Sequence, residues 1–292
     1  MRSLLFVPAD SERKLEKSLG SGADILIVDL EDSVAPDAKP QARRTARTFV
    51  ESARSDTAAR IYVRVNDLAT AMTDDDLAAV MPARPHGVML PKSSSGHDVM
   101  LLSAKLRVCE AQNDIEDGAT RIIPIITETA AGVLAAASYR DTTPRLAGLT
   151  WGAEDLSAAI GARASRDADG RYTDLFRHAR LMTLLAASAA GVPAIDTVFP
   201  NFRDEAAFAA ECAEAERDGF TAKMAIHPQQ LGVINSTFTP SPEAVAEAAK
   251  VVAAFREAGD PGVLALDGQM LDRPHLRLAE RILARAGARN EP

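Results

Sequence analysis

Short, continuously apolar runs alternate with amphipathic segments along most of the chain. Eight of these runs are rich in Ile, Leu and Val and have the length of strands: residues 4–8, 23–30, 61–66, 87–92, 122–126, 146–151, 194–199 and 223–228. Because apolar and polar positions do not alternate within them, they predict strands that are covered on both faces, as in a parallel sheet.

Helical patterns separate most of the apolar runs. They cover residues 10–19, 37–54, 97–113, 130–139, 174–190 and 204–218. This alternation predicts an α/β fold, and eight strands match a closed (β/α)8 TIM barrel. A doubly wound open sheet is the alternative, but no glycine-rich dinucleotide fingerprint follows the first strand.

The pattern changes in the last part of the chain. A helix, a strand-like run and a second helix are predicted over residues 243–258, 263–266 and 277–286. Ser241 is the expected N-cap of the first helix, and Asp267-Gly268 suits a tight turn. This part is too small to be a strong independent domain. We therefore expect a catalytic barrel over residues 1–235 and a C-terminal lid or oligomerisation segment over residues 236–292.

The composition is that of an ordinary globular protein, with 47% hydrophobic and 25% charged residues. The formal net charge of −8 argues against nucleic acid as a partner, since non-specific binding needs a basic field. No run is long enough to span a membrane, and the first apolar run is too short for a signal peptide. Cys109 and Cys212 have no disulfide or metal-type spacing, so we interpret them as buried free thiols in the cytoplasm.

Acidic side chains follow the fifth and sixth predicted strands. Glu128 comes soon after residues 122–126, and Asp155 soon after residues 146–151. Because the carboxyl ends of parallel strands share one face, we expect these two carboxylates to lie close together beside a cleft. Paired carboxylates are a usual ligand set for Mg²⁺, whose other positions hold water and substrate oxygens. The alternative is that each carboxylate caps the helix after it; the pairing on consecutive strands favours the metal.

Charged residues also gather at the ends of the second and third strands. Arg64 lies in an apolar strand, where an unpaired cation would be costly. It can form a structural salt bridge with Asp29 or Glu31, or hold a substrate carboxylate or enolate, and its five donors allow both. With Asp32 nearby, so many carboxylates favour a bound divalent cation. The histidines are scattered, so Mg²⁺, with Mn²⁺ as the alternative ion, is preferred over Zn²⁺.

Seven short motifs occur in order: Phe6-Val7-Pro8, Val28-Asp29-Leu30-Glu31-Asp32-Ser33-Val34-Ala35-Pro36, Val63-Arg64-Val65-Asn66, Leu90-Pro91-Lys92, Glu128-Thr129-Ala130-Ala131-Gly132, Gly152-Ala153-Glu154-Asp155-Leu156 and Ala225-Ile226-His227-Pro228. With these motifs the chain resembles, over essentially its whole length, the citrate lyase β-subunit-like group of the HpcH/HpaI aldolase superfamily. That group includes citryl-CoA, malyl-CoA and citramalyl-CoA lyases. The resemblance implies a (β/α)8 barrel with a C-terminal lid. It also implies a homotrimer or homohexamer whose active site is completed by the neighbouring subunit.

The resemblance assigns roles to individual residues at the strand ends. Glu128 and Asp155 match the Mg²⁺ ligands of the family, and Arg64 matches the arginine that holds the oxygens of the keto acid. We expect Asp29 and Glu31 to support them by orienting Arg64 and the metal-bound waters.

The same resemblance concerns the C-terminal segment. Met270-Leu271-Asp272 is similar to the lid motif, whose aspartate enters the active site of the adjacent subunit. Asp272 is therefore a candidate general acid/base. The alternative is that Asp272 is the N-cap of a helix beyond Pro274.

Binding of coenzyme A is implied by residues near the first strand. Phe6 and Lys17 match positions that contact CoA in malyl-CoA lyase-like members. Where those members carry an arginine soon after the first strand, this chain has Ser11. Arg13 or Lys14 is the expected substitute.

The predicted activity is a Mg²⁺-dependent carbon–carbon lyase of the aldol or Claisen type. Its substrate would be a 3-hydroxyacyl-CoA such as citramalyl-, malyl- or citryl-CoA, split into an acyl-CoA and a 2-keto acid such as pyruvate, glyoxylate or oxaloacetate. One alternative is an acyl-CoA thioester hydrolase on the same scaffold. Others are a carrier-protein-dependent subunit of a citrate lyase complex and a class II aldolase that acts on free hydroxy-keto acids.

Overall fold

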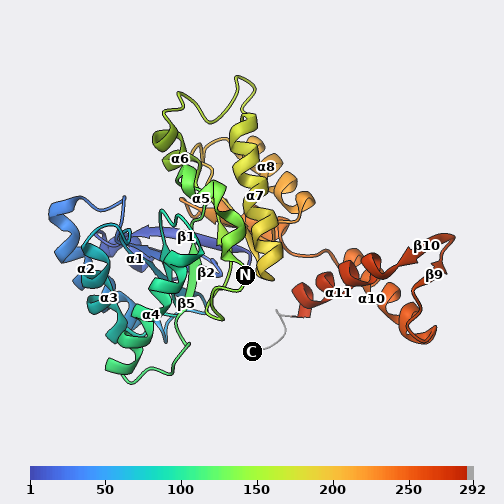
Figure 1. The fold of residues 1–292 in the computed structure, drawn as a ribbon, viewed down its shortest axis with the longest axis horizontal. Helices are drawn as coiled ribbons and strands as arrows, with labels where there is room; N and C mark the ends of the chain where they lie inside the picture. The colour runs from blue at the N-terminus through green and yellow to red at the C-terminus, as the bar shows by residue number, and fades with distance from the viewer. Residues whose placement is uncertain (288–292) are drawn as a thin grey trace. The chain divides into compact units, whose positions relative to one another are not determined.

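The computed structural model describes residues 1–287, and the chain divides into two compact units, Met1–Ile234 and Asn235–Pro292. Figure 1 traces both units along the chain. In the part of the chain that the structure describes, no helix is long and apolar enough to cross a bilayer.

The first unit is built on a sheet of eight parallel strands. They are β1 (Ser3–Pro8), β2 (Ile25–Asp29), β3 (Arg60–Arg64), β4 (Gly87–Leu90), β5 (Arg121–Pro124), β6 (Leu149–Thr150), β7 (Ala194–Asp196) and β8 (Ala222–Ala225). Their order is β5-β4-β3-β2-β1-β8-β7-β6. Parallel bridges from Ile122 to Leu146 and from Ile125 to Thr150 join the two outer strands, so the sheet nearly closes on itself. The predicted TIM barrel is confirmed.

Helices surround this barrel. The α-helices are α1 (Glu12–Ser18), α2 (Lys39–Ala53), α3 (Met72–Val80), α4 (Gly96–Gln112), α5 (Ala130–Leu134), α6 (Ala153–Ile160), α7 (Asp174–Ala190) and α8 (Glu205–Asp218). The division between the two units falls within a further helix, α9 (Gln230–Thr237). Short 3-10 helices are η1 (Pro36–Ala38), η2 (Met81–Ala83) and η3 (Ala136–Tyr139). The helix predicted over residues 130–139 is divided into α5 and η3. Helices α3, α6 and α9, of 9, 8 and 8 residues, were not predicted; helices of this length complete little more than two turns and give a weak helical period.

Alternate strand residues fill the barrel interior. The buried interior cluster consists of Leu4, Ile25, Ile27, Tyr62, Met89, Ile123, Ile125, Ile195, Ala222 and Met224. Strand side chains alternate between faces, so Asp29 follows Ile27, and Arg64 follows Tyr62, on the inward-facing side. Asp29 and Arg64 are partners in the register of β2 and β3. These two charged residues therefore stand at the carboxyl-end mouth of the barrel, above its apolar filling.

The contact between β5 and β6 is held by main-chain bonds and by a buried ion pair. The amide of Ile126 donates to the carbonyl of Thr150 at 2.9 Å, and that of Ile122 donates to the carbonyl of Arg145 at 2.9 Å. The Arg145 guanidinium donates from Nη1 and Nη2 to the two carboxylate oxygens of Glu110, at 2.6 Å each. Arg145 and Glu110 are only 3% and 1% exposed, so this fork is a buried part of the closure.

The second unit contains α10 (Pro242–Glu257), β9 (Val263–Leu266), β10 (Gln269–Asp272) and α11 (Arg273–Gly287). Ser241 caps α10 as predicted, with its side chain accepting from the amide of Ala244 at 3.1 Å. β9 and β10 form an antiparallel hairpin around Asp267 and Gly268, whose φ angles of 49° and 79° suit a tight turn. Strand β10 was not predicted, because four residues with little apolar alternation give no strand signal.

Candidate active site

A cavity of about 320 Å³ opens at the carboxyl ends of the barrel strands. It is lined by Phe6, Pro8, Asp29, Ser33, Arg64, Ile125, Glu128, Trp151, Gly152, Ala153, Glu154, Asp155, Thr197, Val198, Met224 and Ile226. Five predicted site residues, each from the end of a different strand, are therefore brought to one cavity: Phe6, Asp29, Arg64, Glu128 and Asp155.

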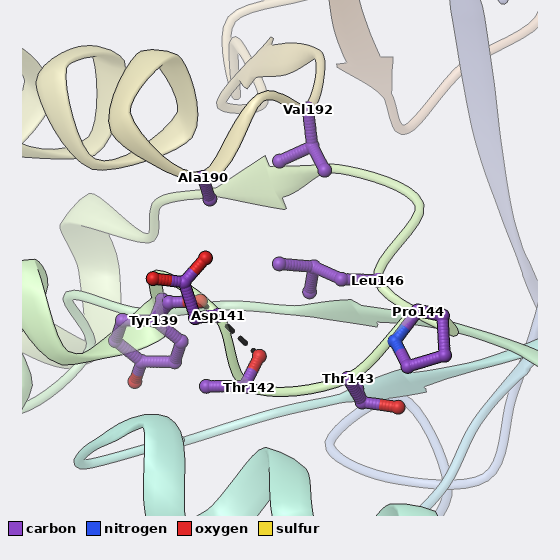
Figure 2. Close-up of a pocket in the computed structure, with 8 residues that line it drawn as sticks. All are labelled: Tyr139, Asp141, Thr142, Thr143, Pro144, Leu146, Ala190 and Val192. Atoms are coloured by element: carbon purple, nitrogen blue, oxygen red, sulfur yellow. Dashed lines mark hydrogen bonds between the residues drawn. The ribbon is translucent and has the colours of Figure 1, made fainter.

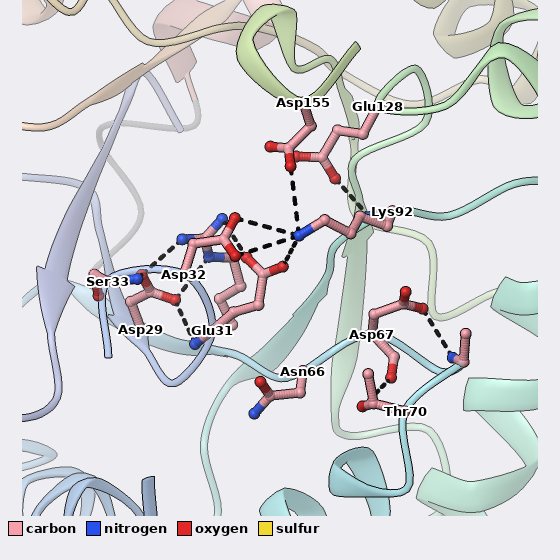
Figure 3. A network of polar contacts seen from close by, with 12 residues as sticks. Asp29, Glu31, Asp32, Ser33, Asn66, Asp67, Thr70, Lys92, Glu128 and Asp155 are labelled. Atoms are coloured by element: carbon pink, nitrogen blue, oxygen red, sulfur yellow. Dashed lines mark hydrogen bonds and ion pairs between the residues drawn. The ribbon is translucent and has the colours of Figure 1, made fainter. Parts of the chain in front are cut away.

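Glu128 and Asp155 approach each other at this cavity, as Figure 3 shows. Glu128 is only 3% exposed and its side chain lies against Gly152, where an added Cβ would come within 2.7 Å of Glu128 Cγ. Gly152 is the N-cap of α6, and Asp155 lies in the first turn of that helix. Burial raises the pKa of Glu128 well above its usual range, and the Asp155 carboxylate raises it further. The pair thus has an excess of negative charge that a cation would relieve.

The alternative role of these carboxylates as helix caps is not supported. The cap of α5 is the Thr129 side chain, which accepts from the amide of Gly132 at 3.0 Å. The N-cap of α6 is Gly152, which has no side chain to cap the helix. Glu128 instead accepts from the amide of Lys92, and Asp155 forms an ion pair with the ammonium of the same residue.

Arg64 is anchored by two carboxylates. Its Nε and Nη2 donate to the two oxygens of Asp29 at 2.7 and 2.6 Å, and Nη1 lies 2.8 Å from Oε2 of Glu31. Burial pushes the pKa of Asp29 upward, but the adjacent guanidinium outweighs burial and holds that pKa below its usual value. The guanidinium also lies 4.8 Å above the ring centre of Phe6. Arg64 is therefore fixed at the cavity wall with hydrogens left on both Nη atoms.

The ammonium of Lys92 completes the polar network in Figure 3. It forms ion pairs with Glu31, with Asp32 at 3.2 Å and with Asp155 at 3.5 Å. Burial alone would lower the pKa of Lys92, but the carboxylate of Glu31 and the other acidic neighbours raise it above its ordinary value. The sequence placed Lys92 in the Leu90-Pro91-Lys92 motif, but we predicted no separate role for it. Its position directly after a strand, in a chain with so many acidic strand ends, was the signal that could have identified it.

The donor set fits a hard divalent cation. Glu128 and Asp155 offer oxygen ligands beside a cavity with room for water or a ligand. Within residues 1–287, no group of three or more His, Cys, Asp and Glu side chains is arranged as a metal centre. The protein would thus supply a pair of carboxylates, and the remaining ligand positions would be filled by water and substrate oxygens.

Of the residues expected to contact CoA, one lines the cavity and three lie exposed on a helix. Phe6 lines the cavity. Arg13, Lys14 and Lys17 lie on α1 and are exposed, and Ser11 precedes this helix. Since α1 follows directly after β1, the three cations stand just beyond the strand that supplies Phe6.

Asp272 lies at the end of β10, directly before α11. Its Oδ1 is 2.6 Å from Nδ1 of His275, and its amide nitrogen is 3.2 Å from the same ring nitrogen. The predicted helix therefore starts earlier than expected, at Arg273, and the partner of the Asp272 carboxylate is a side chain rather than a helix amide. The side chain of Asp272 is 46% exposed.

A second cavity, of about 420 Å³, has a different character. Figure 2 shows its lining residues, which include Leu146 and Val192 from the segments that precede β6 and β7. It therefore lies at the amino ends of these strands, on the face of the barrel that usually serves stability.

The cysteines take no part in either site. Both are free: Cys212 is buried as predicted, and Cys109 is only half-buried, contrary to the prediction.

The chain is similar to known proteins along most of its length. Residues 2–228 match the family model for HpcH/HpaI aldolase/citrate lyase. The (3S)-malyl-CoA thioesterase of Cereibacter sphaeroides is 37% identical over 291 residues, which cover 98% of this chain and 95% of the relative. The mitochondrial citramalyl-CoA lyase of Rattus norvegicus is 32% identical over 298 residues, covering 98% and 86%.

A solved structure matches along the whole chain as well. It is protein CitE from Mycobacterium tuberculosis in complex with magnesium, acetoacetate and coenzyme A. The TM-score is 0.77 at 37% sequence identity, and the match covers 98% of each chain. Both the barrel and the C-terminal unit thus have counterparts in that protein.

Proposed function

The chain belongs to the HpcH/HpaI aldolase/citrate lyase family, and on this premise we propose that it is a Mg²⁺-dependent carbon–carbon lyase acting on a 3-hydroxyacyl-CoA. The products would be an acyl-CoA and a 2-keto acid, and the reaction would be reversible. Citramalyl-CoA and malyl-CoA are the first candidates, because they are named in the relatives at 32% and 37% identity.

One observation carries the proposal: Glu128, Asp155 and Arg64 line a single cavity at the carboxyl ends of the strands. The carboxylates are the proposed Mg²⁺ ligands, and the ion in the CitE complex is also magnesium. When bound, Mg²⁺ would supply Lewis-acid polarisation of the keto-acid oxygen. The excess negative charge between Glu128 and Asp155 supports this assignment, since burial and the neighbouring carboxylate raise the pKa of Glu128.

Arg64 is the proposed electrostatic stabiliser of that oxygen. Asp29 occupies the Nε–Nη2 edge of the guanidinium, and Glu31 occupies one side of Nη1. The remaining Nη hydrogens can donate to the negative charge that develops on the hydroxyl oxygen as its proton is removed before cleavage, or on the keto oxygen as the carbon–carbon bond forms in condensation. Asp29 and Glu31 thus fix the direction of the guanidinium before substrate binds.

Asp272 is the proposed general acid/base, supplied by the second unit of a neighbouring subunit. In cleavage it would accept the proton of the substrate hydroxyl and return it to the enolate carbon of the acyl-CoA. In condensation it would accept a proton from the methyl group of the acetyl thioester and return it to the oxygen of the new hydroxyl. His275 contacts its carboxylate at 2.6 Å and would orient it. This assignment requires at least a dimer, and we propose a homotrimer or homohexamer.

Coenzyme A would bind beside β1 and α1. Phe6 would contact the ligand at the cavity, and the exposed Arg13, Lys14 and Lys17 would pair with its phosphates. The partners proposed are therefore small molecules, a keto acid and a CoA thioester. The free cysteines suit a cytoplasmic location.

The test of the metal ligands uses Glu128→Ala and Asp155→Ala. Each should abolish Mg²⁺-dependent cleavage and weaken Mg²⁺ binding measured by titration calorimetry, while the circular dichroism spectrum stays native. Glu205→Ala is the matched control, because Glu205 is an exposed acid in the first turn of α8 as Asp155 is in α6. If either site variant keeps a near wild-type rate and still requires Mg²⁺, the ligand assignment is wrong.

A thioester hydrolase is the second candidate, favoured by the name of the relative at 37% identity. A panel of CoA thioesters, incubated with the chain and Mg²⁺, separates the two activities. A lyase releases keto acid without free thiol, whereas a hydrolase releases free CoA thiol and hydroxy acid. Turnover of free CoA esters by the purified chain would also exclude a carrier-protein-dependent subunit, and calorimetric binding of CoA would argue against an aldolase for free acids.

A further inference from the structure

Lys92 reaches the proposed metal ligands from the end of β4. Its ammonium lies 3.5 Å from Oδ1 of Asp155, and Figure 3 shows it between that carboxylate and Glu31. Over residues 1–287, Lys92 is the one ion-pair partner of Asp155. The ammonium also has two further acidic partners, Glu31 and Asp32.

The backbone of Lys92 contacts the other proposed ligand. Its amide donates to Oε2 of Glu128 at 2.5 Å. The φ angle of Lys92 is 51°, in the left-handed region that residues with a side chain adopt only at a cost. In this conformation the amide is directed to Glu128 and the side chain to Asp155. One residue therefore contacts both members of the carboxylate pair.

The distribution of charge explains why a cation is needed here. Arg64 is committed to Asp29 through two hydrogen bonds and to Glu31 through a third contact. Asp155 therefore depends on Lys92 for its positive partner. Without that partner, the Asp155 carboxylate would be repelled by the carboxylate of Glu128. The side chain of Lys92 is 27% exposed, so it has room to move.

We infer that Lys92 is a resident counter-ion of the metal site, an inference that rests on the proposed function. In the metal-free protein its ammonium neutralises Asp155, and it leaves Asp155 when a divalent cation takes that carboxylate. Glu31 and Asp32 remain as its partners, so the ammonium stays within the network. Lys92 thus competes with the metal and sets the affinity of the site for it.

Titration calorimetry with MgCl2, in the absence of substrate, measures this competition. Lys92→Met should bind Mg²⁺ about tenfold more tightly than the wild type, because a positive charge beside a ligand is removed. Lys92→Gln, which keeps a polar side chain, should change affinity in the same direction. Lys92→Arg, which keeps the charge, should stay within about twofold of the wild type.

Lys105→Met is the matched control. Lys105 pairs with Asp74 at 2.6 Å on the surface of α4, so its loss removes the same charge away from the carboxylate pair. Its Mg²⁺ affinity should equal that of the wild type. This comparison separates the local effect of Lys92 from a change in net charge.

Thermal unfolding gives an independent measurement. In EDTA, Lys92→Met should melt below the wild type, because Asp155, Asp32 and Glu31 lose their shared cation. Saturating Mg²⁺ should then raise its melting temperature by more than it raises that of the wild type. A variant that does not fold in EDTA but folds with Mg²⁺ also supports the inference.

Unchanged or weaker Mg²⁺ binding in Lys92→Met and Lys92→Gln would overturn the inference. Such a result would leave the proposed function standing if wild type binds Mg²⁺ and Glu128→Ala does not. Equal binding by wild type and Glu128→Ala would instead overturn the metal site itself. The two failures are therefore distinguished in one set of titrations.

Discussion

Arg64 and Asp29 are cross-strand neighbours on β3 and β2, joined by two hydrogen bonds of 2.7 and 2.6 Å. Both side chains point inward at the mouth of the barrel, one layer above Tyr62 and Ile27. This register accounts for the orientation of Arg64 without any ligand. The guanidinium is held in place by the fold, which is the condition for electrostatic stabilisation with little reorganisation.

Replacement of Asp29 by Asn should therefore impair the reaction through Arg64. We expect kcat to fall about 100-fold, because the guanidinium loses its charged anchor and its fixed direction. Steady-state kinetics with a cleaved CoA ester measure this loss. Asp24→Asn is the control, since Asp24 forms a similar fork with Arg2, at 3.0 and 2.6 Å, but lies before β2 rather than at its carboxyl end. Equal losses in both variants would indicate a general effect on folding.

Replacement of Gly152 by Ala should displace Glu128. An added Cβ would lie 2.7 Å from Cγ and 2.9 Å from Oε1 of that residue, so the carboxylate must move. We expect Mg²⁺ affinity to drop about tenfold or more, as when other supports of a metal ligand are removed. Calorimetry with MgCl2 provides the measurement.

The control for Gly152 is Gly232→Ala. Gly232 lies within α9, is exposed, and has no atom within 4 Å of an added Cβ. Its replacement should leave Mg²⁺ affinity unchanged and stabilise the helix by about 1 kcal/mol. Wild-type affinity in Gly152→Ala would mean that Glu128 is not held by this contact.

Most of the barrel was predictable because its strands are buried on both faces. Such burial leaves continuous apolar runs in the sequence, and the carboxylates near the ends of the second, fifth and sixth runs mark the ends of those strands. The meeting of Glu128 and Asp155 at one cavity follows from parallel topology alone. Arg64 and Asp29 were predictable as partners for the same reason, since each ends an adjacent strand.

Lys92 was not predictable in the same way, because its contacts depend on tertiary structure. Its acidic partners Glu31 and Asp32 lie 61 and 60 positions away in the sequence. Its left-handed backbone conformation was not predictable either, because the residue is a lysine and not the glycine or asparagine that commonly adopts it. The packing of Gly152 against Glu128 also has no sequence signal. By contrast, the contact between Asp272 and His275 spans three residues and could have been considered from spacing.

The cations of α1 should affect binding of the CoA ester and not the chemical step. Arg13→Glu and Lys17→Glu should each raise KM about tenfold, the equivalent of one charge-assisted hydrogen bond to phosphate, with kcat nearly unchanged. The effect should shrink at high salt, since exposed charges are screened. Arg44→Glu is the control, because it reverses the charge of an exposed arginine on a different helix, α2. A fall in kcat without a change in KM would contradict CoA binding by this helix.

Asp272 is expected to act in trans, and hybrid oligomers test this. Asp272→Ala and Arg64→Ala should each be inactive alone. Co-expressed and purified as hybrids with two affinity tags, they should recover part of the wild-type rate, because some sites contain both intact residues. No recovery in verified hybrids would count against an active site shared between subunits.

The buried pair of Glu110 and Arg145 should make stability depend on pH. Burial pushes the pKa of Glu110 upward, but hydrogen bonds from Arg145 and from the amides of Thr120 and Gly118 outweigh it and lower that pKa below the ordinary 4.5. A carboxyl group with a lowered pKa in the folded state contributes stability that is fully present above its unfolded pKa. This contribution is lost as the pH falls through the folded pKa.

Glu110→Gln should therefore lose about 2 kcal/mol of unfolding free energy at neutral pH, because the buried guanidinium of Arg145 loses its two-pronged carboxylate partner and keeps only Asp117, at 2.7 Å, as a counter-ion. The difference from wild type should persist down to about pH 5 and shrink as the pH falls below the ordinary glutamate pKa. Urea unfolding at a series of pH values from 7 to 3 measures it. Glu247→Gln, which breaks an exposed pair with Lys250 at 3.4 Å, should change stability by less than about 0.5 kcal/mol. A difference between Glu110→Gln and wild type that stays constant across the series would mean that the fork at the β5–β6 closure is not the titrating element.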